Sequence, residues 1–232
     1  HTIMGTSIPP LVLLMFLLIV VGNSNSNIIC HEKSEIVSEI QKTSFHLGLS
    51  KKIVVNGQES AEYLDMSGVN LSKTINWLQE MNKLPSLSYL YLSSCGLESM
   101  YPSLSYINFT SLTCLGLSEN LFKHEVPNWL GNLSTNLRDL QPPKNALQGQ
   151  IPVALSNIHN LRYLDLNNNQ LTGQITESLG QLQHLQELVL SSNSFYGPIP
   201  ASLGNLSSLT VLFLPFNKLS GSLPNNWGFS QI

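Results

Sequence analysis

Leucines recur at fixed offsets along the second half of the chain, with polar residues between them. From Leu161 the order is leucine, two residues, leucine, one residue, leucine, two residues and asparagine. The same order begins again at Leu185, and once more, after an equal interval, at Leu209. Two leucines separated by one residue lie on the same face of a strand. The pattern therefore predicts one short, half-buried strand in each unit.

A fixed period of about two dozen residues is the signature of a leucine-rich-repeat solenoid, an α/β repeat fold. Stacking the units joins their strands into one parallel sheet, and each unit covers the apolar face of its neighbour. The chain contains seven units, whose spacing shortens slightly at first and is constant from Leu140 onward. Their first strand leucines are Leu64, Leu90, Leu115, Leu140, Leu164, Leu188 and Leu212.

Asparagine and glycine mark the turn that follows each of the last three strands. Asn169, Asn193 and Asn217 stand where the chain turns into the core. A side-chain amide there satisfies backbone groups that would otherwise be buried without partners. A glycine further along each turn permits backbone angles or close approaches that a Cβ would obstruct. These glycines are Gly173, Gly197 and Gly221.

Two units depart from this template. Pro142 takes the place of the second strand leucine in the fourth unit. Because proline has no N–H to donate to a ladder, we expect the sheet to be weakened or broken there. Cys95 takes the place of the turn asparagine in the second unit, and a buried thiol can partly replace the amide as a donor.

A short helix is predicted between the first two strands. Ile75, Leu78 and Met81 recur at helical spacing within residues 72–84. Trp77 lies in the same segment, and we expect it to pack in the core rather than to bind a ligand.

The chain before residue 61 lacks the repeat. Residues 1–26 are predicted to be a secretory signal peptide, because the apolar run 11–21 suits a signal sequence and is too short to cross a bilayer. An uncleaved membrane anchor or a buried helix is the alternative. Residues 27–60 are predicted to form a degenerate amino-terminal cap, and residues 61–232 the repeat domain. We expect no transmembrane segment beyond the signal peptide.

Composition and residue spacing favour a recognition function over nucleic-acid binding, metal binding or catalysis. The net charge is −3 and no run of Lys or Arg occurs, so we expect no nucleic-acid partner. The three cysteines lie far apart with no histidine at ligand spacing, so we expect no metal and no cofactor. His124 and Glu125 lack the second histidine of a zinc helix, and no Ser/His/Asp set is suggested. We therefore predict that the protein is not an enzyme.

A solenoid normally binds its ligand on the concave sheet, where the residues between the strand leucines form a continuous grid. Tyrosine is favoured at such surfaces because it offers apolar area and a hydroxyl at small entropic cost. The alternative is that these residues are ordinary strand surface, with β-propensity explaining the tyrosines. By phase, the predicted ligand-binding grid contains Tyr63, Asp65, Tyr89, Tyr91, Arg138, Asp139, Tyr163, Asp165, Glu187, Val189, Val211, Phe213 and Phe216.

Four Asn-x-Ser/Thr sequences are candidate glycosylation sites, because such sequences accept glycans in a secreted protein where they are exposed. Asn132 and Asn205 are the stronger candidates, since they occupy the same repeat phase on the outer side. The four asparagines are Asn70, Asn108, Asn132 and Asn205.

The turn sequence also carries a family resemblance. Gly197–Leu206 reads Gly-x-Ile-Pro-x-x-Leu-Gly-Asn-Leu, which is the plant extracellular form of the repeat. Residues 63–97 resemble the plant receptor-like proteins of the Cf/EIX disease-resistance type. The resemblance implies a right-handed superhelix with a second sheet beside the concave one. It also implies a cell-surface role in defence or development: detecting a peptide, glycan or protein ligand and signalling through a partner receptor kinase whose ectodomain acts as co-receptor.

Several features of that family do not occur in the sequence. Cys30 resembles the start of the family's amino-terminal cap, but the Trp-containing motif and the paired cysteines are absent. No polar cap follows the last unit, so we expect the chain to be the truncated amino-terminal part of an ectodomain. Two alternatives stay open: a secreted inhibitor resembling the polygalacturonase-inhibiting proteins, and a degenerate product without binding activity.

Overall fold

The computed structural model describes residues 63–100 and 107–223 of the 232-residue chain. The described residues from Asp65 onward belong to one compact unit. The signal peptide (1–26) and the amino-terminal cap (27–60) lie outside the described residues and remain predictions. The chain after residue 223 also lies outside them.

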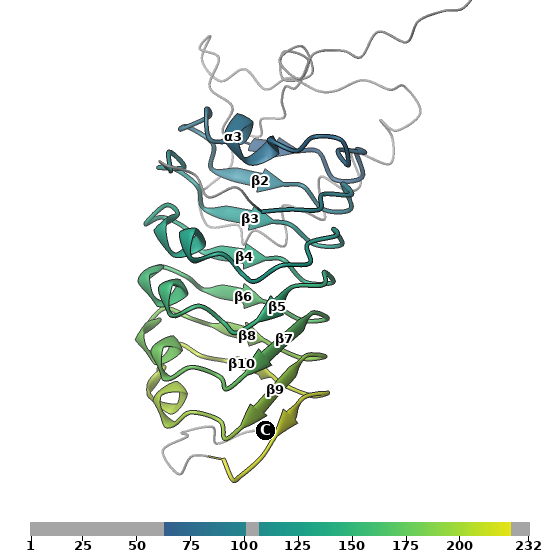
Figure 1. Ribbon diagram of the computed structural model, residues 1–232. Coiled ribbons are helices and arrows are strands. Elements are labelled where there is room, and N and C mark those ends of the chain that lie inside the picture. The colour runs from purple at the N-terminus through teal and green to yellow at the C-terminus, as the bar shows by residue number, and fades with distance from the viewer. Residues whose placement is uncertain (1–62, 101–106, 224–232) are drawn as a thin grey trace, which may run out of the picture. The chain divides into compact units, whose positions relative to one another are not determined.

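Each repeat contributes one three-residue strand to a parallel seven-stranded sheet (Figure 1), in the order β1-β2-β3-β4-β6-β8-β10. The strand leucines pair in register, as Leu164 does with Leu188 and Leu188 with Leu212. This register confirms the predicted repeat frame and fold class. The strands are β1 (Tyr63–Asp65), β2 (Tyr89–Tyr91), β3 (Cys114–Gly116), β4 (Asp139–Gln141), β6 (Tyr163–Asp165), β8 (Glu187–Val189) and β10 (Val211–Phe213).

A second parallel sheet runs beside the first, as the resemblance implied. Its strands, in the order β11-β9-β7-β5, come from the turn region of the later repeats. Each later turn places a glycine at positive φ; Gly173, for example, has φ +86°. The strands are β5 (Gln148–Gly149), β7 (Gln170–Gly173), β9 (Ser194–Gly197) and β11 (Lys218–Leu219).

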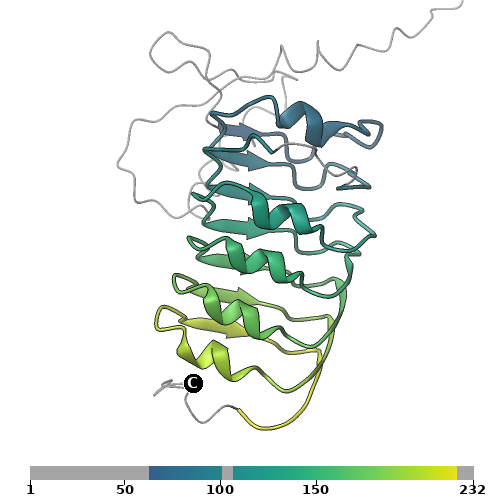
Figure 2. The ribbon, with the colours of Figure 1, turned by 60° about the vertical axis from the view of Figure 1, so that its left-hand side comes forward.

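Short helices cover the side opposite the seven-stranded sheet, stacked one above another (Figure 2). Proline stands before three of the four 3-10 helices, and its fixed φ near −65° suits the residue that begins a helix. One leucine in each of these helices points into the core. The helices are α3 (Trp77–Met81), η1 (Asn128–Asn132), η2 (Val153–Asn157), η3 (Glu177–Gln181) and η4 (Ala201–Asn205).

Helix α3 is shorter than its sequence pattern predicted. Trp77 is buried and donates its ring N–H to the Ser99 carbonyl at 2.8 Å, so its expected packing role is confirmed. Leu78 and Met81 are also buried. The implied core position of Ile75 is wrong: this side chain precedes the helix and is 84% exposed.

The core consists of leucine columns that run the length of the stack. Leu140, Leu164 and Leu188 have essentially no exposed surface, whereas Leu212, on the last described strand of the sheet, is half-buried. Burying one leucine contributes about 1.5–3 kcal/mol, so the columns supply most of the driving force for stacking. Because each leucine touches only adjacent units, the core is linear.

An asparagine column joins neighbouring repeats, as predicted. Nδ2 of Asn169 donates to the carbonyls of Leu166 in its own repeat and Pro142 in the preceding one, both at 3.1 Å. Its Oδ1 accepts from the Leu147 N–H at 3.0 Å. One side chain thus satisfies buried backbone donors and acceptors in two repeats. The same arrangement recurs at Asn120, Asn145, Asn193 and Asn217.

Cys95 replaces the amide in the second repeat, as expected. Its Sγ donates to the Met66 carbonyl at 3.1 Å and lies 3.4 Å from the Ser93 carbonyl. Burial raises the pKa of the thiol to about 11, despite backbone hydrogen bonds that lower it. The residue is therefore a neutral donor at physiological pH.

Pro142 weakens the sheet locally, as predicted, but does not break it. Strand β4 ends at Gln141, one residue before the proline, and pairs with β3 at three positions but with β6 at only two. In other repeats the equivalent N–H donates to the next strand, as Leu166 does to Val189 at 2.9 Å. Proline removes this one rung. The Lys144 N–H restores contact by donating to the next repeat at 2.9 Å.

Candidate functional site: the strand face and its rim

The outward side of the seven-stranded sheet is the candidate site, here called the strand face. In each strand the middle leucine points into the core, so the first and third residues point outward. The register aligns them in two rows. The first row is Tyr63, Tyr89, Cys114, Asp139, Tyr163, Glu187 and Val211; the second is Asp65, Tyr91, Gly116, Gln141, Asp165, Val189 and Phe213.

The structure corrects the grid at the fourth repeat. Arg138 lies one residue before β4, and its carbonyl accepts from the N–H groups of Arg162 and Tyr163. The outward position belongs to Gln141, which aligns with Gly116. The prolines that follow Gln141 hide the usual Leu-x-Leu frame. Counting from Leu140 alone identifies Gln141 as the outward position.

Asp139 points outward by its place in the strand but is only 2% exposed. Gln141 covers it, donating from Nε2 to Asp139 Oδ1 at 2.8 Å. The carboxylate is therefore not accessible to a ligand in this arrangement. Sequence reasoning missed this because burial depends on the neighbouring side chain.

At the third repeat, the outward positions of the strand face carry small residues. Cys114 and Gly116 are both buried, and the sequence reading had placed neither in the grid. The Tyr91 ring lies so close to Gly116 that a Cβ on residue 116 would sit 2.5 Å from Tyr91 Cδ1. The glycine thus sets where this predicted binding tyrosine rests.

The half-buried carboxylates Asp65 and Asp165 have the same local geometry. Each accepts from the backbone N–H two residues later at 2.9 Å, as in an Asx turn. Asn167 donates a second bond to Asp165 from its side chain at 2.6 Å. Burial raises the pKa of Asp165, while the Asn167 bonds and Lys144 oppose that rise.

Beyond β6 the strand face becomes more apolar. Tyr163 donates its hydroxyl to Gln186 Oε1 at 2.8 Å, and Glu187 lies beside it on β8. The next outward positions are Val189, Val211 and Phe213, which is 51% exposed. The predicted grid residues of β6, β8 and β10 are thus brought together.

A rim of left-handed residues borders the strand face, where each strand enters its turn. The N–H of such a residue donates to a carbonyl of the next repeat; Ser94, for example, donates to Ser118 at 2.9 Å. These bonds hold a conformation that side chains other than glycine rarely adopt. The rim residues are Ser94, Glu119, Lys144, Asn168, Ser192 and Phe216, all with φ between 50° and 60°.

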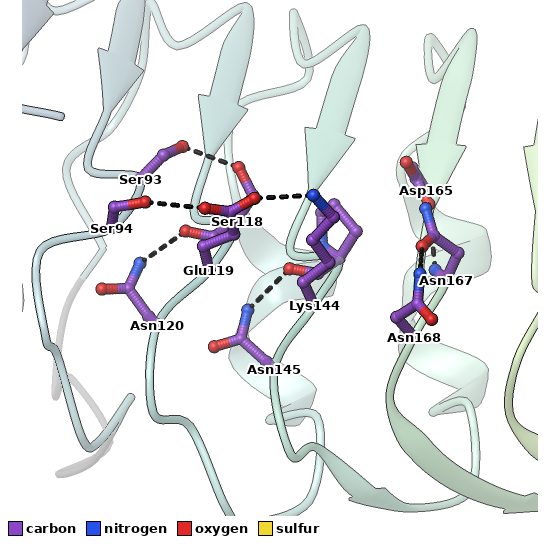
Figure 3. Close-up of polar contacts among 11 residues, drawn as sticks. Ser93, Ser94, Ser118, Glu119, Asn120, Lys144, Asn145, Asp165, Asn167 and Asn168 are labelled. Carbon is purple, nitrogen blue, oxygen red and sulfur yellow. Dashed lines mark hydrogen bonds and ion pairs between the residues drawn. The ribbon is translucent and has the colours of Figure 1, made fainter. Parts of the chain in front are cut away.

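Polar side chains link the first half of the rim (Figure 3). Glu119 accepts from Ser94 Oγ at 3.0 Å and from Lys144 Nζ at 2.7 Å, which joins three repeats. The bond from Lys144 is the main cause that lowers the pKa of Glu119. Ser93 and Ser118 bridge the same repeats at 2.7 Å, so the rim geometry is cross-linked.

The candidate glycosylation sites avoid the strand face. Asn132 and Asn205 are exposed at the ends of η1 and η4, on the helical side, which matches their shared phase. Asn70 is exposed and Asn108 is half-buried. Their occupancy remains a prediction.

Within residues 63–100 and 107–223, no three His, Cys, Asp or Glu side chains gather as metal ligands would. None of the helices in that part of the chain has the length and apolar character to span a membrane.

Comparison with known proteins agrees with this geometry. Residues 159–219 and 111–133 each match a leucine-rich-repeat family model. Receptor-like protein EIX1 of Solanum lycopersicum is 40% identical over 96 residues, which are 40% of this chain and 9% of that protein. The chain therefore carries leucine-rich repeats similar to those of the plant receptor-like proteins. It spans about a tenth of the length of this curated relative.

Solved plant ectodomains share the fold of this chain. The peptide hormone receptor RGFR1, in complex with RGF2, aligns at a TM-score of 0.58 and 35% identity over 62% of this chain and 23% of that one. The Arabidopsis receptor kinase HAESA, in complex with the peptide hormone IDA and the co-receptor SERK1, aligns at a TM-score of 0.58 and 28% identity over 78% of this chain and 33% of that one.

Proposed function

We propose that the strand face and its rim form a peptide-recognition surface of an extracellular, non-catalytic receptor module. One observation carries the proposal: the helical side is packed against the core, whereas the sheet presents two rows of varied side chains, most of them at least partly exposed, that no described element covers. Such rows offer the alternating contacts along a flat surface that an extended peptide needs.

The compared ectodomains support a peptide over other ligands. RGFR1 and HAESA are both described in complex with peptides, and HAESA also with a co-receptor. By this likeness we propose that the present module acts at the cell surface and shares its bound peptide with a co-receptor ectodomain. Defence and development are both compatible with this role.

The position of the candidate glycans supports the same surface. Asn132 and Asn205 lie on the helical side, so glycans there leave the strand face open. A bulky glycan placed on the strand face should therefore block binding, while one more on the helical side should not.

A glycan-wedge experiment tests the proposal. Tyr163→Asn with Asp165→Thr creates a glycosylation sequence on β6, at outward positions of the strand face. The matched control, His159→Ser, completes such a sequence at Asn157, which ends η2 as Asn132 ends η1. Each secreted protein is panned against a displayed library of random dodecapeptides, after thermal unfolding has shown that all three fold.

We expect the unchanged protein and the His159→Ser control to enrich the same peptide sequences. The wedge variant should enrich none of them. Equal enrichment on the wedge variant, or no enrichment on the unchanged protein, overturns the proposal.

A further inference from the structure

The strand face is chemically uneven between β6 and β10. Resting on the proposed function, we propose that this part binds an extended peptide in which a basic side chain and an apolar side chain stand two residues apart. The basic side chain contacts Glu187 and Asp165, and the apolar one packs on Val189 and Phe213.

Strand register places the two chemistries side by side. Glu187 pairs with Tyr163 on one side and Val211 on the other. Asp165, Val189 and Phe213 form the adjacent row. Neighbouring strands lie about 4.8 Å apart, so the acidic groups border the apolar ones directly.

Charge complementarity determines the first half of the ligand. Among the outward positions of the seven described strands there are acidic residues but no Lys or Arg. Lys144, on the rim, is bound to Glu119 at 2.7 Å, and it acts on Asp165 only as the weakest of the causes that lower the pKa of that carboxyl. Asp165 accepts hydrogen bonds from neutral groups of Asn167. A cation supplied by the ligand would therefore meet two carboxylates that no strand-face cation neutralises.

The apolar half points outward from the sheet rather than into the core. Leu212 lies between Val211 and Phe213 and aligns with the core leucines, so its two neighbours point away from the core. Exposing them costs solvation free energy that a bound apolar side chain would recover.

Phe216 extends this apolar area onto the rim. It is 80% exposed and holds φ at +60°, a conformation that is unfavourable for a bulky side chain. The backbone geometry is shared by the other rim residues, so the exposed aromatic ring is what distinguishes this position. Aromatic side chains at this position are suited to anchoring a peptide because they lose little entropy on binding.

The spacing follows from strand geometry. Glu187 on β8 and Phe213 on β10 are diagonal neighbours, about 7 Å apart. In an extended peptide, side chains on the same side recur every two residues, also about 7 Å. A peptide that crosses the strands can thus place its basic residue over Glu187 and the residue two positions later over Phe213.

Defined peptides test the inference by fluorescence polarisation on the secreted protein. The probes are labelled heptapeptides of glycine and serine with Arg-Ser-Phe, Glu-Ser-Phe or Arg-Ser-Ser at the centre. We expect Arg-Ser-Phe to bind at least tenfold more tightly than either of the others. Glu187→Lys should reverse the Arg-over-Glu preference, and Phe213→Ser should abolish the dependence on phenylalanine.

Glu177→Lys is the matched control, because it makes the same charge change on exposed η3 of the helical side and should leave all three affinities unchanged. Equal affinities for the Arg and Glu probes, or an unchanged preference in Glu187→Lys, overturn the inference. If no probe binds while the dodecapeptide library still enriches other sequences on the strand face, the inference fails and the proposed function stands. If the library also enriches nothing, both fail.

Discussion

Asparagine side chains carry the buried polar contacts between repeats. Each one reaches backbone groups of two repeats, as Asn169 does for Leu166 of its own repeat and Pro142 of the preceding one. A buried backbone group without a partner costs about 1–3 kcal/mol, more than a typical hydrogen bond contributes when formed. The importance of the column therefore comes from what its removal would leave unsatisfied.

Asn169→Ala should lower the free energy of unfolding by about 3 kcal/mol, because it strands a buried N–H and several carbonyls. Urea unfolding followed by circular dichroism measures the change. Asn168→Gly is the control: this neighbour is exposed and has φ +50°, so glycine should cost less than about 0.5 kcal/mol. Similar losses in both variants would contradict the assigned role.

Cys95 should resist alkylation in the folded protein. Only the thiolate reacts, and burial raises the pKa of this thiol from 9.0 to about 11. Mass spectrometry after iodoacetamide treatment at pH 8 should find Cys95 unmodified in the native protein and modified in urea. Because the folded thiol holds its proton more tightly than the unfolded one, stability should fall as pH rises from about 9 to 11. Rapid native labelling at pH 8 would count against this.

At the scale of the element, two glycines in the turns hold positive φ in different surroundings. Gly173 has φ +86°, and a Cβ there would lie 2.7 Å from Gln150 Cγ. Gly68 has φ +79° but open space where its Cβ would be. The two positions thus separate backbone strain from steric contact.

Gly68→Ala should cost about 1 kcal/mol for strain alone, and Gly173→Ala about 2 kcal/mol or more. Adding Gln150→Ala removes the clashing atom and should recover the difference but not the strain. Urea unfolding of Gly68→Ala, Gly173→Ala, Gln150→Ala and the double variant Gly173→Ala with Gln150→Ala measures these losses. Comparing the double variant with its two single variants gives the coupling free energy. Additive losses would show that Gln150 does not press on this turn.

Element positions followed from sequence wherever one signal repeats. Leucine spacing alone placed all seven strands, because every unit buries its leucines in the same way. The structure differs from the sequence prediction where the outcome depends on a neighbouring residue. Pro142 cost one hydrogen bond rather than a strand, because β4 ends before it. Asp139 lost its exposure to Gln141, which sequence phase could not show.

Across the whole described unit, the two sides differ in use. Helices, buried leucines and candidate glycans occupy one side, and the two rows of varied side chains occupy the other. The sequence predicted which residues share the strand face, except at Arg138 and at the third and fourth repeats' outward positions Cys114, Gly116 and Gln141. It could not predict how far each is buried, since that depends on packing across strands.

Glycan occupancy should follow exposure. Glycopeptide mass spectrometry of the secreted protein should find Asn70, Asn132 and Asn205 largely occupied. Asn108 should be occupied less, because it is half-buried and its backbone N–H donates to Asn82 Oδ1 at 2.7 Å. Asn132→Gln should remove one glycan without changing the free energy of unfolding by more than about 0.5 kcal/mol. Full occupancy of Asn108 would contradict the expected order.

Main-chain bonds hold the left-handed conformation of the rim, and side-chain bonds among Ser94, Glu119 and Lys144 add to them in its first half. Six different positions carry serine, glutamate, lysine, asparagine, serine and phenylalanine at nearly one φ, and backbone bonds to the next repeat hold Ser94 through Ser192 in that conformation. Side chains there can therefore be exchanged as a set while the scaffold keeps its form. A laboratory seeking new affinities could randomise these six sites together and expect most of the resulting proteins to fold.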